Sequence, residues 1–417
     1  MKRKRIAFFA EILVRDFDGA TRTMFEIIDR IDRKRYEFIF FCGVPPKEDI
    51  GFEVFHIPTL TIPFNKTYKM ASMVGMGPTI IRKLKDFSPD LIHVATPAPL
   101  GYFALKYGLK HKIPVSTIYH THFISYIKYY TNNTPLITNA FEKALIQHNR
   151  SFYDRCSRIF IPTEVMKEEL EEKGFDISQM KIWQRGINTK LFNPRKKNPA
   201  FIKEIVQNDK TNILFASRLV WEKNLQVLVE IQKVIREKNL EYNLILAGDG
   251  VAREELEKLL PEAYFIGHVN HQTLSKLYAS SDYFIFTSIT ETYGNVVAEA
   301  MVSGLPCIVA DGGGPKSFIK EGINGFICKP NEAKDYLRKI RLLEEHPEFK
   351  ERMIKKAIED MKDLTWNNLV ENLFNDIDDV IKSYNQNKQN SRLTNNEDFD
   401  LSHLFMIDSN LQLSVAS

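Results

Sequence analysis

Short apolar runs and longer amphipathic stretches alternate along this chain. In the first half, runs rich in β-branched and aromatic residues are separated by stretches whose apolar residues recur with helical spacing. This alternation predicts a parallel sheet with helices on both faces. The predicted strands are 5–10, 37–42, 90–95, 114–120 and 158–162, and a first helix is predicted over 24–31.

The same pattern begins again after the polar, proline-bearing stretch 188–199. Because 417 residues exceed one ordinary core, we expect an α/β protein of two doubly wound, Rossmann-like domains facing across a cleft. The domains are placed at 1–187 and 188–364, followed by a helix over 365–384 with Thr365 as its N-cap. The Asn/Gln-rich tail 385–417 is predicted to be disordered. The strands of the second domain are predicted at 212–217, 242–247, 264–267, 282–287 and 306–310, with a helix over 253–260.

Composition narrows the class of protein. The net charge is only +4, so bulk electrostatics do not indicate a nucleic-acid partner. The four cysteines are widely spaced, which favours reduced thiols in a cytoplasmic protein over disulfides or zinc. The basic and apolar start resembles a signal peptide, but Glu11 interrupts it, so we predict a first strand there. No apolar run approaches the roughly 20 residues that span a bilayer.

Two glutamates stand eight positions apart where a predicted strand passes into a helix. Gly294 gives the turn its freedom, so Glu291 belongs to the loop and Glu299 to the helix. Alone, the pair is compatible with acid–base catalysis, metal binding or a grip on two ends of an extended ligand. The carboxyl end of a strand in an open α/β sheet is where ligands bind. The backbone N–H groups of 292–295, at a helix N-terminus, add capacity for an anion.

A cationic pair follows the first strand of the second domain. Arg218 and Lys223 are five residues apart across a turn, so both can converge on one anion. The alternative is a solvated surface cluster, which the strand-end position disfavours. Because Arg218 and Lys223 can bind the anionic part of a ligand, Glu291 and Glu299 are better interpreted as acceptors of hydrogen bonds from sugar hydroxyls.

The first domain offers weaker signals. Gly19 follows the first strand and can let a ligand approach the backbone, or can simply relieve a tight turn. A single glycine there disfavours a nicotinamide dinucleotide site. His120 and His122 close the strand 114–120, where metal binding, a structural histidine or a hydrogen bond to ligand are all open; we favour the last, since no third metal ligand lies nearby. The glycines 312–314 are a weak phosphate signal.

Together these motifs resemble the retaining glycosyltransferases of family four, which have the GT-B architecture. The resemblance spans 5–380 and rests on S-R-L-V-W-E-K-N at 217–224, the two glutamates at 291 and 299, the glycine loop, and E-G-I-N-G-F at 321–326. D-G-A-T-R-T at 18–23 and Y-H-T-H-F at 119–123 resemble the branch with α-mannosyltransferases and sulfoquinovosyltransferases. That branch usually carries an acidic residue where His122 stands.

The resemblance implies a retaining, metal-independent hexosyltransferase with no cofactor other than its GDP- or UDP-sugar donor. The acceptor would be a lipid, a glycan or a polyol, and no protein nucleophile is needed because the leaving phosphate takes the acceptor proton. The final helix would return to the first domain, and closure of the two lobes would gate the reaction.

The resemblance also implies a role for each candidate residue. Arg218 and Lys223 would hold the diphosphate, Glu291 the donor sugar and Glu299 the ribose. Backbone groups of Thr292, Tyr293 and Gly294 would face sugar and phosphate, and His268 and Val269 would flank the base. Gly19 would admit the phosphates, and His120 would bond the sugar near the reacting carbon.

Two other functions remain as alternatives: a GT-B epimerase acting on the nucleotide sugar, and a catalytically silent binding protein. The full set of charges argues against both, since isolated buried charges without a partner cost free energy. The stretches 64–85 and 123–155 mix apolar and basic residues, which suits either peripheral contact with the inner face of a membrane or ordinary packing on the sheet.

Overall fold

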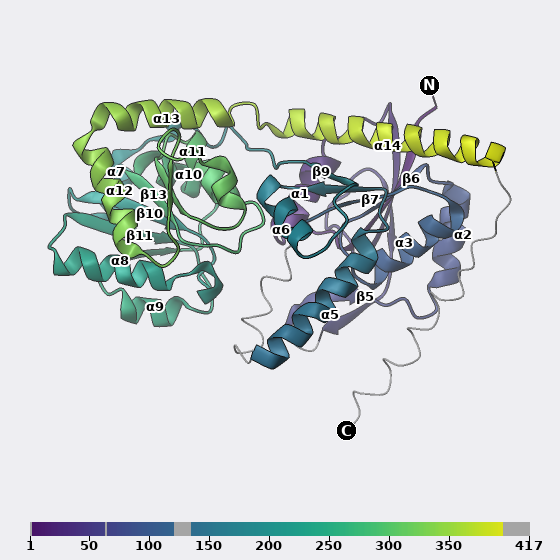
Figure 1. Cartoon of the computed structure of the whole chain (residues 1–417), viewed down its shortest axis with the longest axis horizontal. Helices are drawn as coiled ribbons and strands as arrows, with labels where there is room; N and C mark the ends of the chain where they lie inside the picture. The colour runs from purple at the N-terminus through teal and green to yellow at the C-terminus, as the bar shows by residue number, and fades with distance from the viewer. Residues whose placement is uncertain (1, 63–64, 121–134, 395–417) are drawn as a thin grey trace.

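The computed structural model describes residues 2–62, 65–120 and 135–394. The chain forms two lobes, and it crosses between them near residues 185–187 and again near 364–366 (Figure 1). The crossings lie side by side, since the Ile187 N–H donates to the Leu364 carbonyl at 2.7 Å. Each lobe is built on a parallel sheet, as the alternation of apolar runs predicts.

In the described residues of the first lobe, the main sheet has seven parallel strands in the order β3-β2-β1-β6-β7-β8-β9. Side chains of β1 alternate between two apolar layers: Phe8 joins the layer that contains α1, and Phe9 joins the layer that contains α3. Burial on both faces is typical of a parallel sheet. The strands are β1 (Lys4–Ile12), β2 (Tyr36–Val44), β3 (Glu53–His56), β6 (Leu91–Val94), β7 (Val115–Ile118), β8 (Arg158–Ile161) and β9 (Met180–Ile182). The helices are α1 (Gly19–Ile28), α2 (Gly77–Phe87), α3 (Pro99–His111), α5 (Pro135–Tyr153) and α6 (Glu164–Glu172), and β4 (Thr59–Ile62) pairs with β5 (Asn65–Ala71) as an antiparallel hairpin.

The second lobe contains six parallel strands in the order β12-β11-β10-β13-β14-β15. The chain leaves β10 toward β11 and β12, then crosses back to β13 on the other side. This reversal makes the carboxyl ends of β10 and β13 a switch point, the usual ligand crevice of an open α/β sheet. The strands are β10 (Thr211–Ala216), β11 (Tyr242–Ala247), β12 (Tyr264–Gly267), β13 (Tyr283–Phe286), β14 (Cys307–Ala310) and β15 (Phe326–Cys328). The helices are η1 (Pro194–Lys196), α7 (Pro199–Val206), η2 (Trp221–Lys223), α8 (Gln226–Glu237), α9 (Arg253–Leu259), α10 (His271–Ser280), α11 (Asn295–Val302), η3 (Gly314–Phe318), α12 (Ala333–Glu345) and α13 (Pro347–Met361).

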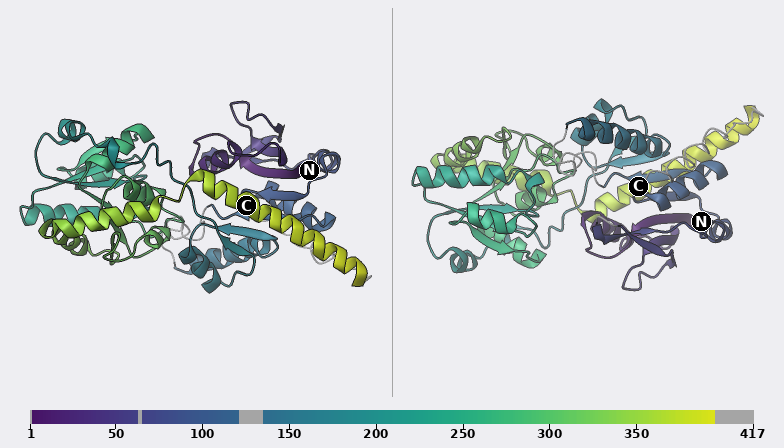
Figure 2. Two further views of the ribbon diagram at one scale, coloured as in Figure 1. Left: turned by 90° about the horizontal axis from the view of Figure 1, so that it is seen from above. Right: turned by 90° about the horizontal axis from the view of Figure 1, so that it is seen from below.

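The last helix, α14 (Trp366–Thr394), lies along the first lobe, as all views show (Figures 1 and 2). Its apolar side joins the core layer of β1: the Phe374 ring lies 4.6 Å from the Tyr36 ring, and the Trp183 indole N–H donates to the Leu369 carbonyl at 2.7 Å. Asp378 accepts from the Tyr36 hydroxyl at 2.8 Å. The helix therefore returns to the first lobe after the chain has left the second.

The predicted bounds were wrong at both ends of the first helix, which ends at Ile28 instead of 31, and at the end of the last helix. The first helix begins at Gly19 instead of 24, because the Asp18 carboxylate caps it. Thr365 does cap α14, accepting from the Asn368 N–H at 3.3 Å, but the helix continues to Thr394. The prediction of disorder is therefore wrong for 385–394, since a helix that has already nucleated extends with one hydrogen bond per added residue. The rest of the predicted tail, 395–417, lies outside the described residues, and the domain boundaries stay a prediction.

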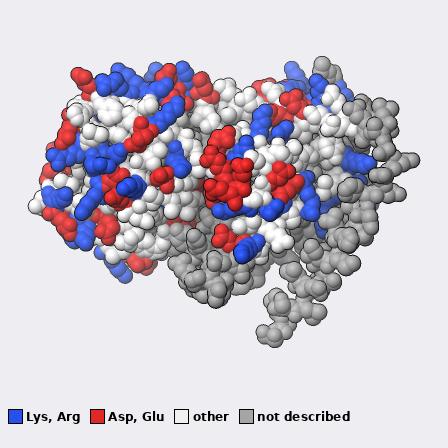
Figure 3. All heavy atoms as spheres, viewed as in Figure 1, with Lys and Arg blue, Asp and Glu red and all other residues white. Residues whose placement is uncertain are grey.

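The visible surface carries mixed charge. Lys and Arg are interspersed with Asp and Glu over the second lobe, while acidic side chains gather over α6, where Glu164, Glu168, Glu171 and Glu172 are exposed (Figure 3). Within the part of the chain that the structure describes, no helix combines the length and apolar character required to traverse a bilayer.

Candidate active site

The loop after β10 carries the predicted cationic pair. Arg218 is largely exposed, whereas the Lys223 side chain is only 2% exposed at the end of the short η2 helix. The neighbouring loop of Gly248 and Gly250 supports this segment: the Leu219 N–H donates to the Asp249 carbonyl at 2.9 Å, and a Cβ on either glycine would collide with the backbone of 217–219. The backbone that leads to Lys223 is therefore held in place before any ligand binds.

Hydroxyls beyond β13 fix the same turn from the other side of the switch point. The Thr287 hydroxyl donates to the Lys223 carbonyl at 2.9 Å, and the Thr290 hydroxyl donates to the Glu222 carbonyl at 3.2 Å. Because β10 and β13 are adjacent strands, their two loops are tied together directly. This brings Lys223 against the predicted Glu291 loop.

The charged groups form one cluster. Lys223 Nζ lies 3.0 Å from Glu291 Oε1 and 3.7 Å from Glu222 Oε1, and Arg218 Nη2 lies 3.2 Å from the same Glu222 oxygen. The two cations thus converge, but on Glu222, which the sequence prediction did not include. The glutamate that directly precedes Lys223 was the available signal, although charge runs of this kind are common on surfaces.

Glu291 and Glu299 occupy the predicted elements. Glu291 lies in the loop and Glu299 in α11, separated by Gly294. Gly294 has φ of 86°, and a Cβ there would lie 2.5 Å from the Pro315 side chain, so a glycine is required. Burial raises the pKa of Glu299 to about 7, while Arg22 of α1 opposes this rise. The positive charge of Arg22, on the first lobe, therefore influences the pKa of Glu299, on the second lobe.

The glycine loop does not present its N–H groups as expected. The Gly312 N–H donates to the Ala310 carbonyl at 2.9 Å, and the Gly314 N–H donates to the Glu291 carbonyl at 2.7 Å. A Cβ on Gly313 would lie 2.8 Å from that Glu291 oxygen. The glycines let this loop lie directly against the Glu291 loop, so for Gly312 and Gly314 the expectation of N–H groups open to a phosphate was wrong.

On the first lobe, Gly19 is the first residue of α1. Asp18 and Thr21 form a reciprocal cap, in which Asp18 Oδ1 accepts from the Thr21 N–H at 2.8 Å and the Asp18 N–H donates to Thr21 Oγ1 at 2.9 Å. A Cβ on Gly19 would have Arg185 Nη1 as its nearest neighbour, at 3.8 Å. A small side chain at position 19 would therefore not be excluded by a tight turn.

His120 is buried, with 6% of its surface exposed. Neither ring nitrogen has a hydrogen-bond partner among the described residues, which argues against a structural histidine satisfied by the backbone. Burial, aided by the charge of Arg185, keeps the pKa of His120 well below its usual value, so the imidazole is neutral. His122 lies outside the described residues.

The remaining predicted residues line the second lobe. Thr292 is buried in the Glu291 loop, and Val269 is partly buried in the loop after β12, packed on the core beside the exposed His268. Tyr293 is also buried, and its hydroxyl donates to the Arg185 carbonyl at 2.9 Å. The Tyr293 side chain thus connects the second lobe to the crossing between the lobes. From the sequence, only the backbone of Tyr293 was expected to contribute to the site.

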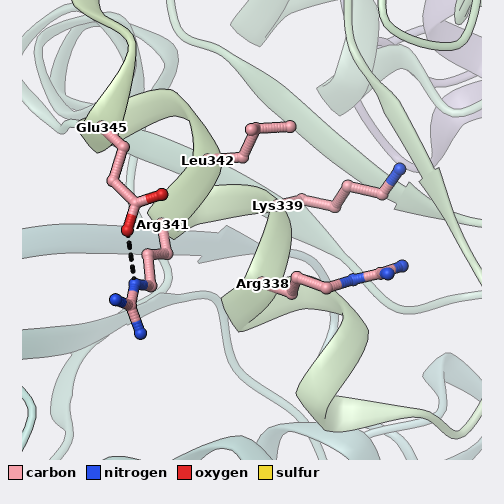
Figure 4. A pocket seen from close by; sticks show the side chains of 5 residues that line it. All are labelled: Arg338, Lys339, Arg341, Leu342 and Glu345. Carbon is pink, nitrogen blue, oxygen red and sulfur yellow. Dashed lines mark hydrogen bonds and ion pairs between the residues drawn. The ribbon is translucent and has the colours of Figure 1, made fainter.

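Two other features of the described residues are relevant to the site. Within the described ranges, no three His, Cys, Asp or Glu side chains gather in a group that could hold a metal ion. The shallow hollow of Figure 4 lies on the outer side of α12, lined by Arg338, Lys339, Arg341, Leu342 and Glu345. Its three cations already pair with Asp335, Glu321 and Glu345, so it lacks the free charge of an anion site.

Two family models match the chain in succession. Residues 17–191 match the model described as Glycosyltransferase Family 4, and residues 197–360 match the model described as Glycosyl transferases group 1. The first model covers the Gly19 and His120 side of the cleft, and the second covers the Lys223 and Glu291 side.

Relatives and solved structures agree with these models. The chain is 28% identical over 388 residues to the GDP-mannose-dependent alpha-mannosyltransferase of Corynebacterium glutamicum, covering 90% of this chain and 89% of that protein. It is 29% identical over 377 residues to the sulfoquinovosyl transferase SQD2 of Arabidopsis thaliana, covering 88% and 71%. The crystal structure of Anabaena HepE in complex with UDP superposes with a TM-score of 0.71 at 16% identity, covering 90% of this chain and 100% of that one. The chain therefore belongs to the family-four glycosyltransferases, and its two facing α/β lobes have the GT-B architecture.

Proposed function

We propose that this glycosyltransferase moves a hexose from a GDP- or UDP-sugar to a lipid, glycan or polyol acceptor, with retention of configuration and without a divalent metal. The observation that carries the proposal is the switch-point cluster of the second lobe. The buried Lys223 ammonium and the exposed Arg218 guanidinium pair with the carboxylates of Glu222 and Glu291, and Glu299 lies farther along the same segment, in α11. This spacing suits a diphosphate flanked by two sugars.

The cluster is neutralised internally in the free protein, because Lys223 is paired with Glu291 at 3.0 Å. A bound diphosphate would take over Lys223 and Arg218 as partners. Glu291 would then accept from donor-sugar hydroxyls and Glu299 from the ribose. The cations oppose the negative charge that grows on the leaving diphosphate as the glycosidic bond breaks, which is usually the largest catalytic effect.

The configuration at the anomeric carbon is retained if the acceptor approaches the sugar from the same face that the diphosphate leaves. The acceptor oxygen forms the new bond to the anomeric carbon, and its proton passes to the departing phosphate oxygen. His120, neutral and with both ring nitrogens unpartnered among the described residues, can bond a hydroxyl of the donor sugar. Gly19, at the N-terminus of α1, leaves room for the phosphates, while Thr292, Tyr293, Gly294 and Val269 would shape the sugar and base subsites.

Incubation with radiolabelled GDP-mannose, UDP-glucose and related donors, together with a lipid extract, tests the proposal. Transfer is the expected result; isomerised donor would instead favour the epimerase, and binding alone the silent protein. The anomeric configuration of the product, read by NMR, tests retention. Unchanged turnover in EDTA tests metal independence.

A thermal-shift screen should identify the donor. A ligand at 100 times its dissociation constant stabilises the folded state by about 2.7 kcal/mol. The names of the relatives place GDP-mannose first in the screen, and the UDP complex of HepE places UDP-sugars second. Glu299→Ala should remove this stabilisation, because the ribose loses its acceptor.

A lipid acceptor would bring the first lobe to a membrane surface. Phe141 of α5 is 57% exposed and Val74, just before α2, is 86% exposed, so apolar groups are available for such contact. Within the stretches 64–85 and 123–155 of the sequence, residues 64 and 123–134 lie outside the described residues. Flotation with anionic vesicles should carry the protein upward; a protein that stays in the soluble fraction would favour ordinary packing helices.

A further inference from the structure

Arg185 stands where the chain first crosses between the lobes. The crossing is tight: the next residue is Gly186, and a Cβ there would lie 2.6 Å from the indole and the backbone nitrogen of Trp366. The Ile187 N–H is bonded to Leu364 of the return crossing. The backbone that carries Arg185 is therefore held close to the return crossing.

Arg185 contacts both lobes from this position. Its Nη2 donates to the His120 carbonyl of the first lobe at 3.1 Å. Its own carbonyl accepts from the Tyr293 hydroxyl of the second lobe at 2.9 Å, and its guanidinium lies 5.8 Å from the Tyr293 ring. One residue thus joins a candidate catalytic group on one lobe to the donor loop on the other.

The buried charge needs an explanation beyond packing. Arg185 is 8% exposed, and burial of a guanidinium costs free energy that a well-packed apolar side chain would avoid. Burial lowers the pKa of Arg185, while Tyr293, Glu291 and Asp18 oppose this, with Arg22 as the nearby like charge. Of the two carboxylates involved, Glu291 belongs to the charged cluster of the second lobe and Asp18 caps α1 of the first.

We infer that Arg185 is a positioning residue for hexosyl transfer: it fixes the backbone of His120, and through Tyr293 it makes the place of that imidazole depend on the arrangement of the two lobes. The inference rests on the proposed function. Both ring nitrogens of His120 are left without a partner among the described residues, so the imidazole depends on its backbone for its orientation. Among the described residues, the charged and titratable groups that act on His120 are Arg185 and His93, and both favour its neutral form.

Arg185→Gln and Arg185→Lys, with steady-state kinetics across pH, test this inference. The glutamine variant should lose about a hundredfold in kcat, as small misplacements of a reacting geometry do, with the donor KM near the wild-type value. Loss of the positive charge raises the pKa of His120, so the acid limb of the pH profile should move to higher pH. Arg185→Lys keeps the charge, and its acid limb should stay in place while kcat recovers in part.

Controls separate this role from folding. Arg341→Gln removes an exposed guanidinium on α12 and should leave kcat and KM unchanged. If Arg185→Gln fails to show a thermal transition, Tyr293→Phe carries the test. It removes only the hydroxyl bonded to the Arg185 carbonyl and should lower kcat without moving the acid limb.

Three outcomes would overturn the inference. A folded Arg185→Gln with unchanged kcat and pH profile would make the residue a hinge element only. A raised donor KM at constant kcat would make it a direct donor contact. Absence of transfer by the wild-type protein with every donor would instead overturn the proposed function, and this inference with it.

Discussion

The two faces of the cleft handle charge in opposite ways. On the second lobe, Lys223, Arg218, Glu222 and Glu291 form a cluster of ion pairs that is assembled before any ligand binds. On the first lobe, His120 is neutral and both its nitrogens lack a partner among the described residues. Under the proposed function, we expect the charged cluster to exchange ion-pair partners when the donor binds, whereas His120 would gain a hydrogen-bond partner.

This difference has an energetic reason. A buried ammonium without a counter-ion is strongly unfavourable, so Lys223 must be paired in the free protein. A buried neutral imidazole without a hydrogen-bond partner costs less free energy than a buried unpaired charge. His120 can therefore lack a described partner in the free protein. Removal of a group should therefore have different consequences on the two faces.

The largest effect is expected for Lys223→Ala. It removes the buried cation that we propose binds the donor diphosphate, and transfer should fall by about 10³-fold. The labelled-donor transfer assay measures this change. Lys203→Ala, which removes an exposed lysine paired with Asp209, is the control and should behave as wild type. Nearly full activity of Lys223→Ala would show that the charged cluster is not needed for transfer.

His120→Ala should cost about 10²-fold in kcat, the scale of one positioned hydrogen-bonding side chain. Because the imidazole has no described partner to leave unpaired, the thermal transition should change less than in Lys223→Ala. Calorimetry and steady-state kinetics of both variants test this order. His56→Ala, on the exposed side of β3, serves as the control. Equal losses of stability in the two variants would contradict the contrast between the faces.

Glu299→Gln should weaken donor binding and change its pH dependence. The pKa of Glu299 in the folded protein is about 7, so the carboxyl group is protonated below this pH and accepts ribose hydrogen bonds best above it. Wild-type donor affinity should therefore rise as pH increases through about 7, and the glutamine variant should lack this rise. At high pH the loss should be about 1.5–3 kcal/mol, typical of hydrogen bonds to charged groups. Isothermal titration calorimetry at several pH values measures the donor affinity of the wild type and of the variant. Protonation of the donor phosphates affects both proteins equally, so it does not contribute to the difference between them. A parallel pH dependence in both would contradict the assignment.

The smallest effect is expected for Gly19→Ala. The added Cβ has its nearest neighbour at 3.8 Å, so the free protein should keep its thermal transition. If the phosphates approach this backbone, donor KM should rise by up to about tenfold, or about 1.4 kcal/mol. Gly77→Ala is a matched control, because Gly77 also begins a helix and its Cβ would also have a neighbour at 3.8 Å. An unchanged KM would place the donor away from α1.

The sequence alone determined the two parallel sheets and the polar loops at the ends of their strands. Apolar runs at regular intervals must be buried, and in parallel sheets their carboxyl ends share one edge, so Lys223 and Glu291 could be assigned to one site. The sequence did not predict the short strands β3, β9 and β15 or the hairpin β4–β5. Segments this short contain too few residues to show a clear hydrophobic pattern.

Only the tertiary structure decided which groups meet. Arg185 bonds to His120 across 65 residues of sequence and to Tyr293 across 108, so no local spacing could reveal these contacts. The glycines 312–314 are a weak phosphate signal in the sequence, and in the structure the close approach of the Glu291 loop explains them. Local chemistry identifies what a strand end can bind, whereas the packing of two lobes decides which side chains are already occupied and which remain open for a ligand.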